Sequence, residues 1–326
     1  MTTIVLPHLK VKETESIASA VLEGLSARPK RLPPWLFYDA AGSRLFDDIT
    51  ELPEYYLTRT ERGILAAHAE AMTAQASEGK RLRIVELGAG SADKTRLLLR
   101  AAVARQGTVR YEPVDVSASA LEAARERIER EIPGVSVVPR VMDYTQGLDL
   151  APEGPDERRM VLYIGSSIGN FEPKDADALL QRVRAGLRPG DALLLGVDLA
   201  KDPATLLAAY DDAAGVTARF NLNLLARLNR ELEANFDLLG FAHRAEWNPL
   251  ESRMEMHLES LTAQRVRVAG LDLEVNFTAG ERIHTENSYK YRPGQAEAML
   301  SQAHFTPVQT WTDAQGWFAV SLSRAE

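Results

Sequence analysis

The 326-residue sequence contains no cysteine. This absence excludes disulfide bonds, a cysteine nucleophile and metal sites built from thiolates. Histidine is also sparse. The six histidines are scattered along the chain and form neither an H-x-x-x-H nor an H-E-x-x-H spacing. We therefore expect no metal site in this protein.

Long apolar runs and blocks of basic residues are missing as well. No segment approaches the roughly 20 apolar residues of a membrane span, and the first residues, MTTIVLPHLKVKETES, lack the apolar stretch of a signal peptide. A net charge of −8 without a Lys/Arg-rich block argues against nucleic acid as a partner. We expect a cytoplasmic monomer that acts on a small molecule, with no membrane or nucleic acid partner.

The most informative stretch that is present is LRIVELGAGSADKTRLLL, residues 82–99. It reads as a buried strand, a turn at Gly88 and Gly90, and a helix, which together begin a doubly wound α/β domain. The dinucleotide fingerprint is incomplete because Asp93 replaces its third glycine. The pattern E-L-G-x-G instead resembles the first motif of class I methyltransferases, in which this loop carries S-adenosylmethionine; the alternative is an ordinary tight turn.

Acidic residues end the next strands of this predicted domain. Asp115 closes a strand over 109–116, where nucleotide-binding folds hold ribose hydroxyls. Asp143 and Tyr144 follow a strand over 135–141, where they would bind an adenine amino group and cover the ring, unless Asp143 is only a turn residue before Thr145. These positions favour a cofactor site at the carboxyl ends of the strands.

The fourth strand, 160–164, leads into Gly165-Ser-Ser-Ile-Gly-Asn170 at the same crevice, where we expect the substrate. Ser167 occupies the middle of a G-x-S-x-G pattern, the nucleophile position of an α/β-hydrolase. That alternative lacks acid and histidine partners in a recognisable context.

The remaining pattern predicts an interrupted architecture. A helix over 175–187 and a strand over 192–198 are followed by a helical stretch, 203–239, and by period-two sequence over 241–290. A helix at 295–303 and strands at 307–312 and 318–323 then complete a seven-stranded sheet. We predict an α/β Rossmann-like lobe over 60–198 and 291–326, and a second, α+β lobe over 1–59 and 199–290.

The N-terminal part contains predicted helices at 14–25, capped by Thr14, and at 59–74. Between them, residues 32–60 are unusually aromatic. These rings either attach an irregular segment to the main domain or form the wall of a pocket.

Two strands of the second lobe carry a notable pattern. Alternation places Met254, Met256 and Leu258 on one face, and Glu286 and Ser288 on one face about 6 to 7 Å apart. A carboxylate and a hydroxyl at that separation can bind the two nitrogens of one imidazole. The alternative is a solvated strand face.

Six motifs in this order give the sequence a specific resemblance. They are LPPWLFYDAAGSRLFDDIT, LPEYYLTRTE, ELGAGSADKTR, IGSSIGN, AYDDAAGVT and TENSYKY. Together they resemble the histidine-specific Nα-methyltransferases of ergothioneine biosynthesis, over nearly the whole chain from Arg31 to Ser323. The resemblance implies a class I methyltransferase core and a substrate-binding lobe.

The resemblance also implies site residues. Those that would bind S-adenosylmethionine are Tyr38, Gly88, Gly90, Lys94, Asp115, Asp143, Tyr144 and Gly165. Asn170 and Tyr210 would hold the α-amino and carboxylate groups of L-histidine, and Phe46 and Tyr55 would wall the pocket. Glu286 and Ser288 would bind the imidazole, with Met256 beside the ring. Tyr144 departs from the family pattern, in which phenylalanine is common.

The implied reaction transfers three methyl groups to the α-nitrogen of histidine through mono- and dimethylated intermediates and gives hercynine, the betaine from which ergothioneine is made. Tyr38 or Tyr55 would assist removal of the amine proton, with Asn170 as the third residue at the reacting group. The alternatives are methylation of another amino acid or an aromatic amine and, more distantly, a non-catalytic ligand-binding protein on this scaffold.

Overall fold

The computed structural model describes residues 7–90, 92–145, 147–148, 150, 154 and 156–326, without the side chains of 7–15 and 119. The chain divides into two units. We call Leu57–Ala200 with Lys290–Glu326 the Rossmann-like unit, and Met1–Tyr56 with Lys201–Tyr289 the second unit. Within the described part of the chain, none of the helices has both the length and the apolar character needed to cross a membrane.

The Rossmann-like unit alternates strands and helices along the sequence. Its elements are α3 (Tyr56–Ser77, whose first residue belongs to the second unit), β2 (Arg81–Leu87), α4 (Thr95–Gln106), β3 (Val109–Asp115), α5 (Ala118–Glu131), β4 (Val135–Val137), β5 (Arg140–Val141), β6 (Glu157–Tyr163), the 3₁₀ helix η2 (Ser167–Asn170), α6 (Pro173–Ala185), β7 (Ala192–Asp198), α9 (Gln295–Gln302), β13 (Phe305–Thr312) and β14 (Phe318–Ala325).

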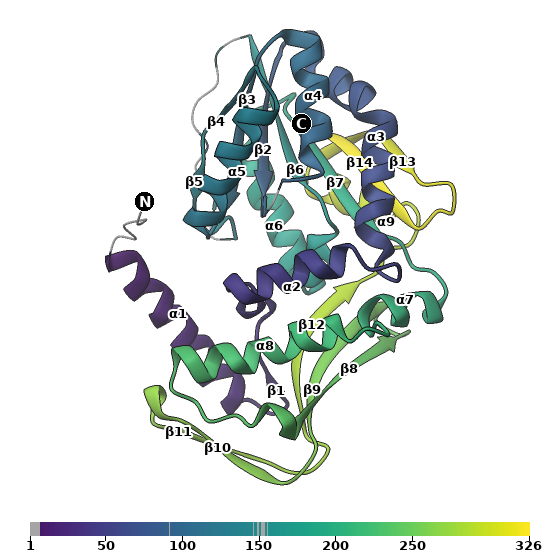
Figure 1. Ribbon diagram of the computed structural model, residues 1–326. Helices are drawn as coiled ribbons and strands as arrows, with labels where there is room; N and C mark the ends of the chain where they lie inside the picture. Colours follow the sequence, from purple (N-terminus) through teal and green to yellow (C-terminus); the bar gives the residue numbers. More distant parts are fainter. Residues whose placement is uncertain (1–6, 91, 146, 149, 151–153, 155) are drawn as a thin grey trace. The chain divides into compact units, whose positions relative to one another are not determined.

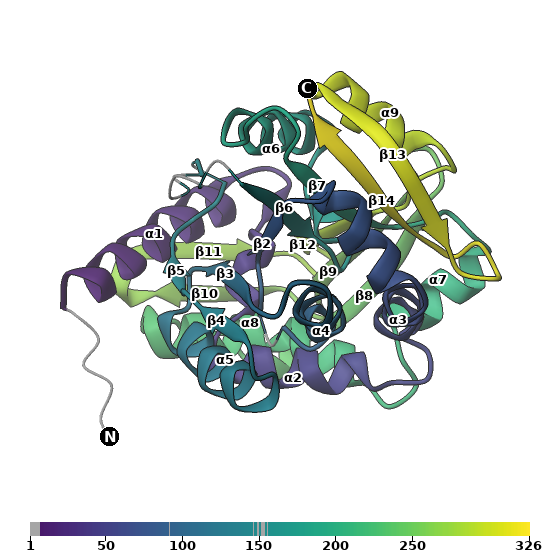
Figure 2. The same cartoon turned by 90° about the horizontal axis from the view of Figure 1, so that it is seen from above.

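These strands form one sheet in the order β13-β14-β7-β6-β2-β3-β4, with β5 also paired to β3. The strands from β7 to β4 are parallel, and β14 and β13 are antiparallel additions. Figure 2 shows α3, α4 and α5 on one face of the sheet and α6 and α9 on the other. The order reverses at β2, because β3 and β6 lie on its two sides, and ligands of such sheets bind at this switch point.

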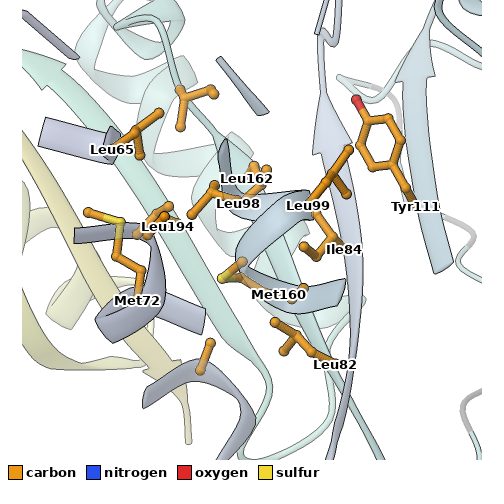
Figure 3. Packing of buried hydrophobic residues seen from close by; sticks show 14 of the residues in the cluster. Leu65, Met72, Leu82, Ile84, Leu98, Leu99, Tyr111, Met160, Leu162 and Leu194 are labelled. Carbon is orange, nitrogen blue, oxygen red and sulfur yellow. The ribbon is translucent and has the colours of Figure 1, made fainter. Parts of the chain in front are cut away.

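Burial explains why the central strands are almost entirely apolar. Six of the seven β2 residues and all seven of β7 are buried, as expected for parallel strands covered by helices on both faces. Side chains of α3, α4, β2, β6 and β7 meet in one cluster, which includes Leu65, Leu98, Ile84, Met160 and Leu194 (Figure 3). This core supports the loops at the carboxyl ends of the strands.

The structure confirms the predicted Rossmann-like fold and corrects one strand. The predicted strand over 135–141 is two short strands, β4 and β5, so the sheet has eight strands where we expected seven. The break separates Val137, which pairs with β3 near the middle of that strand, from Arg140, which pairs near its end.

The second unit combines helices with a sheet and a hairpin. Its elements are α1 (Pro7–Ser26), β1 (Lys30–Arg31), η1 (Pro34–Phe37), α2 (Ala40–Thr50), α7 (Pro203–Tyr210), α8 (Val216–Glu231), η3 (Leu238–Gly240), β8 (Phe241–Asn248), β9 (Arg253–Ser260), β10 (Gln264–Val268), η4 (Ala269–Leu271), β11 (Leu273–Phe277) and β12 (Arg282–Tyr289). The sheet has the order β1-β12-β9-β8, and β10 pairs with β11.

One face of the four-stranded sheet is covered by helices. Helices α7 and α8 contact β8 and β9, and α2 contacts α8, an arrangement that can be followed in Figure 1. In β9 the covered face carries Met254, Met256 and Leu258, all buried, as the predicted alternation requires.

Two helix predictions in this unit are wrong in their limits. The helical stretch predicted over 203–239 is interrupted after Tyr210, because the Asp212 carboxylate accepts hydrogen bonds from the N–H groups of Val216 (2.9 Å) and Thr217 (2.7 Å) and so starts α8. Helix α1 begins at Pro7, so Thr14 lies within it and is not its cap.

A one-residue bulge interrupts the pairing of β12 with β9. His284 pairs with His257 and Glu286 pairs with Met256, which leaves Thr285 as the extra residue. The Thr285 hydroxyl donates to the Met256 carbonyl at 3.0 Å. Because two residues oppose one, His284 and Glu286 lie on opposite faces of the sheet although they are two positions apart.

Candidate active site

The loop after β2 reverses the chain over two glycines. Gly88 and Gly90 have φ angles of +66° and +48°, a region that side chains with a Cβ adopt only at a cost. A Cβ on Gly88 would lie 3.5 Å from the Tyr144 hydroxyl. The loop therefore presents bare backbone beside an aromatic ring, which suits the close approach of a flat ligand group.

Carboxylates from the next two strand ends lie near this loop. Asp115 accepts hydrogen bonds from the N–H groups of Ser117 (3.0 Å) and Gly90 (3.4 Å). Asp143, which is exposed, accepts from the backbone and hydroxyl of Thr145 at 2.9 and 2.6 Å, so the turn role considered in the sequence analysis is present. A carboxylate has several acceptor positions, so this role leaves Asp143 able to bind a ligand as well.

Tyr144 covers one side of this group. Its ring packs edge to face against Tyr163, with centroids 5.9 Å apart, and burial raises its pKa. The phenol therefore stays protonated at neutral pH and presents a neutral ring face. The structure brings Gly88, Gly90, Asp115 and Tyr144 together, and their binding of the cofactor stays a prediction.

Glu61 is a residue of this site that the sequence analysis missed. Its carboxylate, fully buried on α3, forms an ion pair with Lys94 and accepts the Gly165 N–H at 2.8 and 3.0 Å. It thus joins the start of α4 to the end of β6. A Cβ on Gly196 of β7 would collide with this carboxylate, so a glycine provides the space. The only signal in the sequence was its place at the end of the LPEYYLTRTE motif.

The glutamate of the E-L-G-x-G motif has a different role. Glu86 is buried and accepts hydrogen bonds from Tyr111 and from Thr95, the latter at 2.7 Å. Burial raises its pKa to about 7, although the two hydrogen bonds oppose that shift. Glu86 therefore connects β2 to the first residue of α4 through a buried hydrogen bond.

The loop after β6 is shaped by backbone geometry. Ser166 is left-handed (φ 58°), and its hydroxyl accepts the Asp198 N–H at 2.9 Å. Ser167 begins η2, and its hydroxyl donates to the Ile164 carbonyl at 3.2 Å, a contact within the loop. Asn170 ends η2 and is half-buried.

In the second unit, polar side chains gather on the covered face of β12. Glu286 and Ser288 are 8 % and 4 % exposed, which contradicts the alternative of a solvated strand face. The Tyr210 and Ser288 hydroxyls are 2.7 Å apart, and Met256 is the cross-strand partner of Glu286. Four predicted residues are thus neighbours on one surface.

Aromatic rings extend this group toward the N-terminal segment. Ring centroids are 6.5 Å apart for Tyr55 and Tyr210, 6.2 Å for Phe46 and Tyr55, and 5.7 Å for Tyr38 and Phe46. Phe220 of α8, which the sequence analysis did not single out, contacts Tyr38 and Phe46 at 5.8 and 6.0 Å. The aromatic segment therefore joins the polar group, as a pocket wall would.

The predicted residues fall into two groups, one in each unit. The Rossmann-like unit contains Gly88, Gly90, Lys94, Asp115, Asp143, Tyr144, Gly165 and Asn170; the second unit contains Tyr38, Phe46, Tyr55, Tyr210, Met256, Glu286 and Ser288. Tyr38 and Asn170 are each expected to act with residues of the other group, and that cooperation remains a prediction.

Comparison with known proteins identifies the chemistry. A family profile described as "Histidine-specific methyltransferase, SAM-dependent" matches residues 17–325. The histidine N-alpha-methyltransferases of Mycolicibacterium smegmatis and Mycobacterium tuberculosis are 48 % and 47 % identical to this chain, over 95 % and 93 % of both proteins in each pair. Ergothioneine biosynthesis protein 1 of Neurospora crassa is 33 % identical over 87 % of this chain and 32 % of its own length.

Among solved structures, an S-adenosylmethionine-dependent methyltransferase from Clostridium acetobutylicum aligns with 80 % of this chain and 90 % of its own, at 12 % identity and a TM-score of 0.45. The assignment rests on the sheet topology and on the family match over almost the whole chain. The protein is an α/β enzyme of the class I methyltransferase type, and the chain belongs to the family of histidine-specific, S-adenosylmethionine-dependent methyltransferases.

Proposed function

We propose that this enzyme transfers three methyl groups to the α-amino nitrogen of L-histidine and produces hercynine, the first step of ergothioneine biosynthesis. The observation that carries the proposal is the buried group formed by Glu286, Ser288, Tyr210 and Met256. The mycobacterial relatives named for this activity support it.

The chemistry of an imidazole matches the polar residues of this group. An ionised Glu286 accepts from one ring N–H, and the Ser288 hydroxyl can donate to or accept from the other nitrogen. Met256 supplies an apolar surface beside the ring. An amino acid without an imidazole N–H would not form the hydrogen bond that histidine gives to the buried Glu286 carboxylate, so we expect it to bind less tightly than histidine.

The amino acid end of histidine requires alignment more than chemical activation. We assign Tyr210 and Asn170 to hold its amino and carboxylate groups, with Tyr55 and Phe46 as the aromatic wall. Holding the nitrogen in line with the methyl carbon and the leaving sulfur can contribute about 7 to 11 kcal/mol to lowering the barrier. The nucleophile must be the neutral amine, and we assign Tyr38 or Tyr55 to assist proton removal, directly or through water.

The donor's sulfonium supplies an activated methyl group and a good leaving group. The residues at the β2 and β3 ends fit this donor: bare backbone at Gly88 and Gly90, a carboxylate for ribose hydroxyls at Asp115, and a ring face at Tyr144. We assign Lys94, Gly165 and Asp143 to the same site.

Mass spectrometry of L-histidine incubated with the enzyme and S-adenosylmethionine tests the proposal. We expect the trimethylated product, and a panel of other amino acids and aromatic amines should give much less product. If another member of the panel is methylated faster than histidine, that compound is the acceptor and the proposal is wrong. Tight histidine binding without any turnover would contradict catalysis. Tyr38→Phe or Tyr55→Phe should change the pH–rate profile if the phenol of that tyrosine assists proton removal.

We further propose that the enzyme acts as a monomer in the cytoplasm, with L-histidine and its mono- and dimethylated forms as its partners. Light scattering of the purified protein and cell fractionation test these two statements.

A further inference from the structure

Tyr210 is the last residue of α7, a position at which a helix leaves carbonyl groups without partners. The Tyr210 carbonyl receives a hydrogen bond from the His243 imidazole, with Nε2 2.8 Å from the oxygen. His243 lies on β8 and is 8 % exposed. A side chain of the sheet therefore holds the end of the helix that carries Tyr210.

The partners of the imidazole determine its protonation. A carbonyl only accepts, so Nε2 carries the proton, and Nδ1 is then the acceptor for the Asn221 amide nitrogen at 2.9 Å. Burial lowers the pKa of His243, which favours this neutral form. Both ring nitrogens are thus used, and the ring orientation is fixed.

Asn221 is in turn oriented by two acceptors. Its amide nitrogen, on α8, faces His243 Nδ1 and also donates to the His257 carbonyl at 3.1 Å. The side chain is fully buried, and its oxygen has no hydrogen-bond partner among the described residues. The position therefore requires the two N–H groups of a carboxamide, which an aspartate cannot supply.

This chain of contacts ends at the proposed imidazole pocket. The hydroxyl of Tyr210, whose carbonyl His243 holds, lies 2.7 Å from Ser288 Oγ. We propose that His243 and Asn221 are positioning residues that fix Tyr210 against Ser288 and thereby set the affinity of the enzyme for its acceptor. This inference rests on the proposed function, and it concerns the acceptor and not the methyl donor.

Steady-state kinetics of His243→Leu and His243→Gln provide the first test. Leucine removes the hydrogen bond and should raise KM for histidine about tenfold, because the Tyr210 carbonyl loses its partner. Glutamine offers an N–H to that carbonyl and an oxygen to Asn221, so it should recover most of the loss. The dissociation constant of S-adenosylhomocysteine should stay within twofold in both. Arg244→Leu, at the adjacent exposed position of β8, is the matched control and should leave KM for histidine unchanged.

A double-mutant cycle with Tyr210→Phe tests whether His243 acts through Tyr210. If it does, His243→Leu should raise KM for histidine much less in the Tyr210→Phe background than in the wild type. Asn221→Asp should give the same KM defect as His243→Leu. Fully additive losses, an unchanged KM in His243→Leu, or equal losses of histidine and S-adenosylhomocysteine affinity would each overturn the inference. Wild-type turnover of histidine, measured alongside, separates this failure from a failure of the proposed function.

Discussion

The loop of the Rossmann-like unit and the polar group of the second unit are built in different ways. The loop is one continuous stretch between β2 and α4, and its main contribution is backbone shaped by Gly88 and Gly90. The polar group is assembled from side chains of α7, β9 and β12, tens of residues apart in sequence. This difference leads us to expect that donor binding depends on the loop backbone and on the buried side chains that support it, whereas acceptor binding depends on individual side chains that contact the acceptor.

The strongest test of this contrast is Glu286→Ala. Removing a buried carboxylate that pairs with the imidazole should lower kcat/KM for histidine about 100-fold, a loss of about 3 kcal/mol. Affinity for S-adenosylhomocysteine, measured by calorimetry, should remain unchanged. The control is Glu246→Ala, which removes a half-exposed carboxylate paired with Arg282 in the same unit. Equal losses for donor and acceptor would break the contrast.

Glu61→Gln tests whether a side chain also determines the affinity of the Rossmann-like unit for S-adenosylmethionine. Neutralising this buried partner of Lys94 should weaken S-adenosylmethionine binding about 30-fold, or about 2 kcal/mol, and leave KM for histidine largely unchanged. Glu70→Gln, an exposed change on the same helix, should have no effect on either substrate. Unaltered donor binding in Glu61→Gln would show that the backbone alone is sufficient.

The raised pKa of Glu86 predicts a pH effect that belongs to the Rossmann-like unit. Because the folded state holds its proton up to about pH 7 and the unfolded state releases it near pH 4.5, stability should fall as pH rises between these values. The expected contribution is about 1.5 kcal/mol between pH 5.5 and 7. Urea unfolding of Glu86→Gln should lack this component; identical pH dependence in both proteins would contradict the prediction.

Of these substitutions, Gly88→Ala should have the smallest effect on catalysis, and it should change only the binding of the methyl donor. A Cβ at a φ of +66° and close to the Tyr144 hydroxyl should cost about 1 kcal/mol and raise KM for S-adenosylmethionine about fivefold. Gly79→Ala is a matched control, because that glycine has a φ of +83° with open space around it. If Gly79→Ala raised KM for S-adenosylmethionine equally, the effect of Gly88→Ala would be due to lost stability and not to its place beside the donor.

Elements with local signals were predicted closely from the sequence. Strand β7 has the predicted limits Ala192–Asp198, and the ELGAG loop lies between a buried strand and a helix. These elements were predictable because apolar runs and glycine turns act over a few residues. The break between α7 and α8 also had a signal, the sequence YDDAAG, but the leucine-rich pattern on both sides obscured it.

Features that depend on distant segments were not predictable. The partners of Glu61 come from α4 and the loop after β6, and those of His243 from α7 and α8. No local pattern distinguishes these residues from ordinary surface or core residues. The burial of Glu286 likewise depends on α7 and α8 covering the sheet, which strand alternation alone does not reveal.

The bulge at Thr285 changes how a missing or added residue in this strand should be interpreted. Because Thr285 is the unpaired residue between the His284 and Glu286 pairs, a deletion there would leave both pairs in register and keep Glu286 directed inward. A deletion at Asn287 would instead turn the next side chain, Ser288, to the opposite face. A relative in which the residue equivalent to Thr285 is deleted can therefore bind the same acceptor. A relative that keeps the Glu-x-Ser sequence but has a deletion elsewhere in this strand does not necessarily bind it.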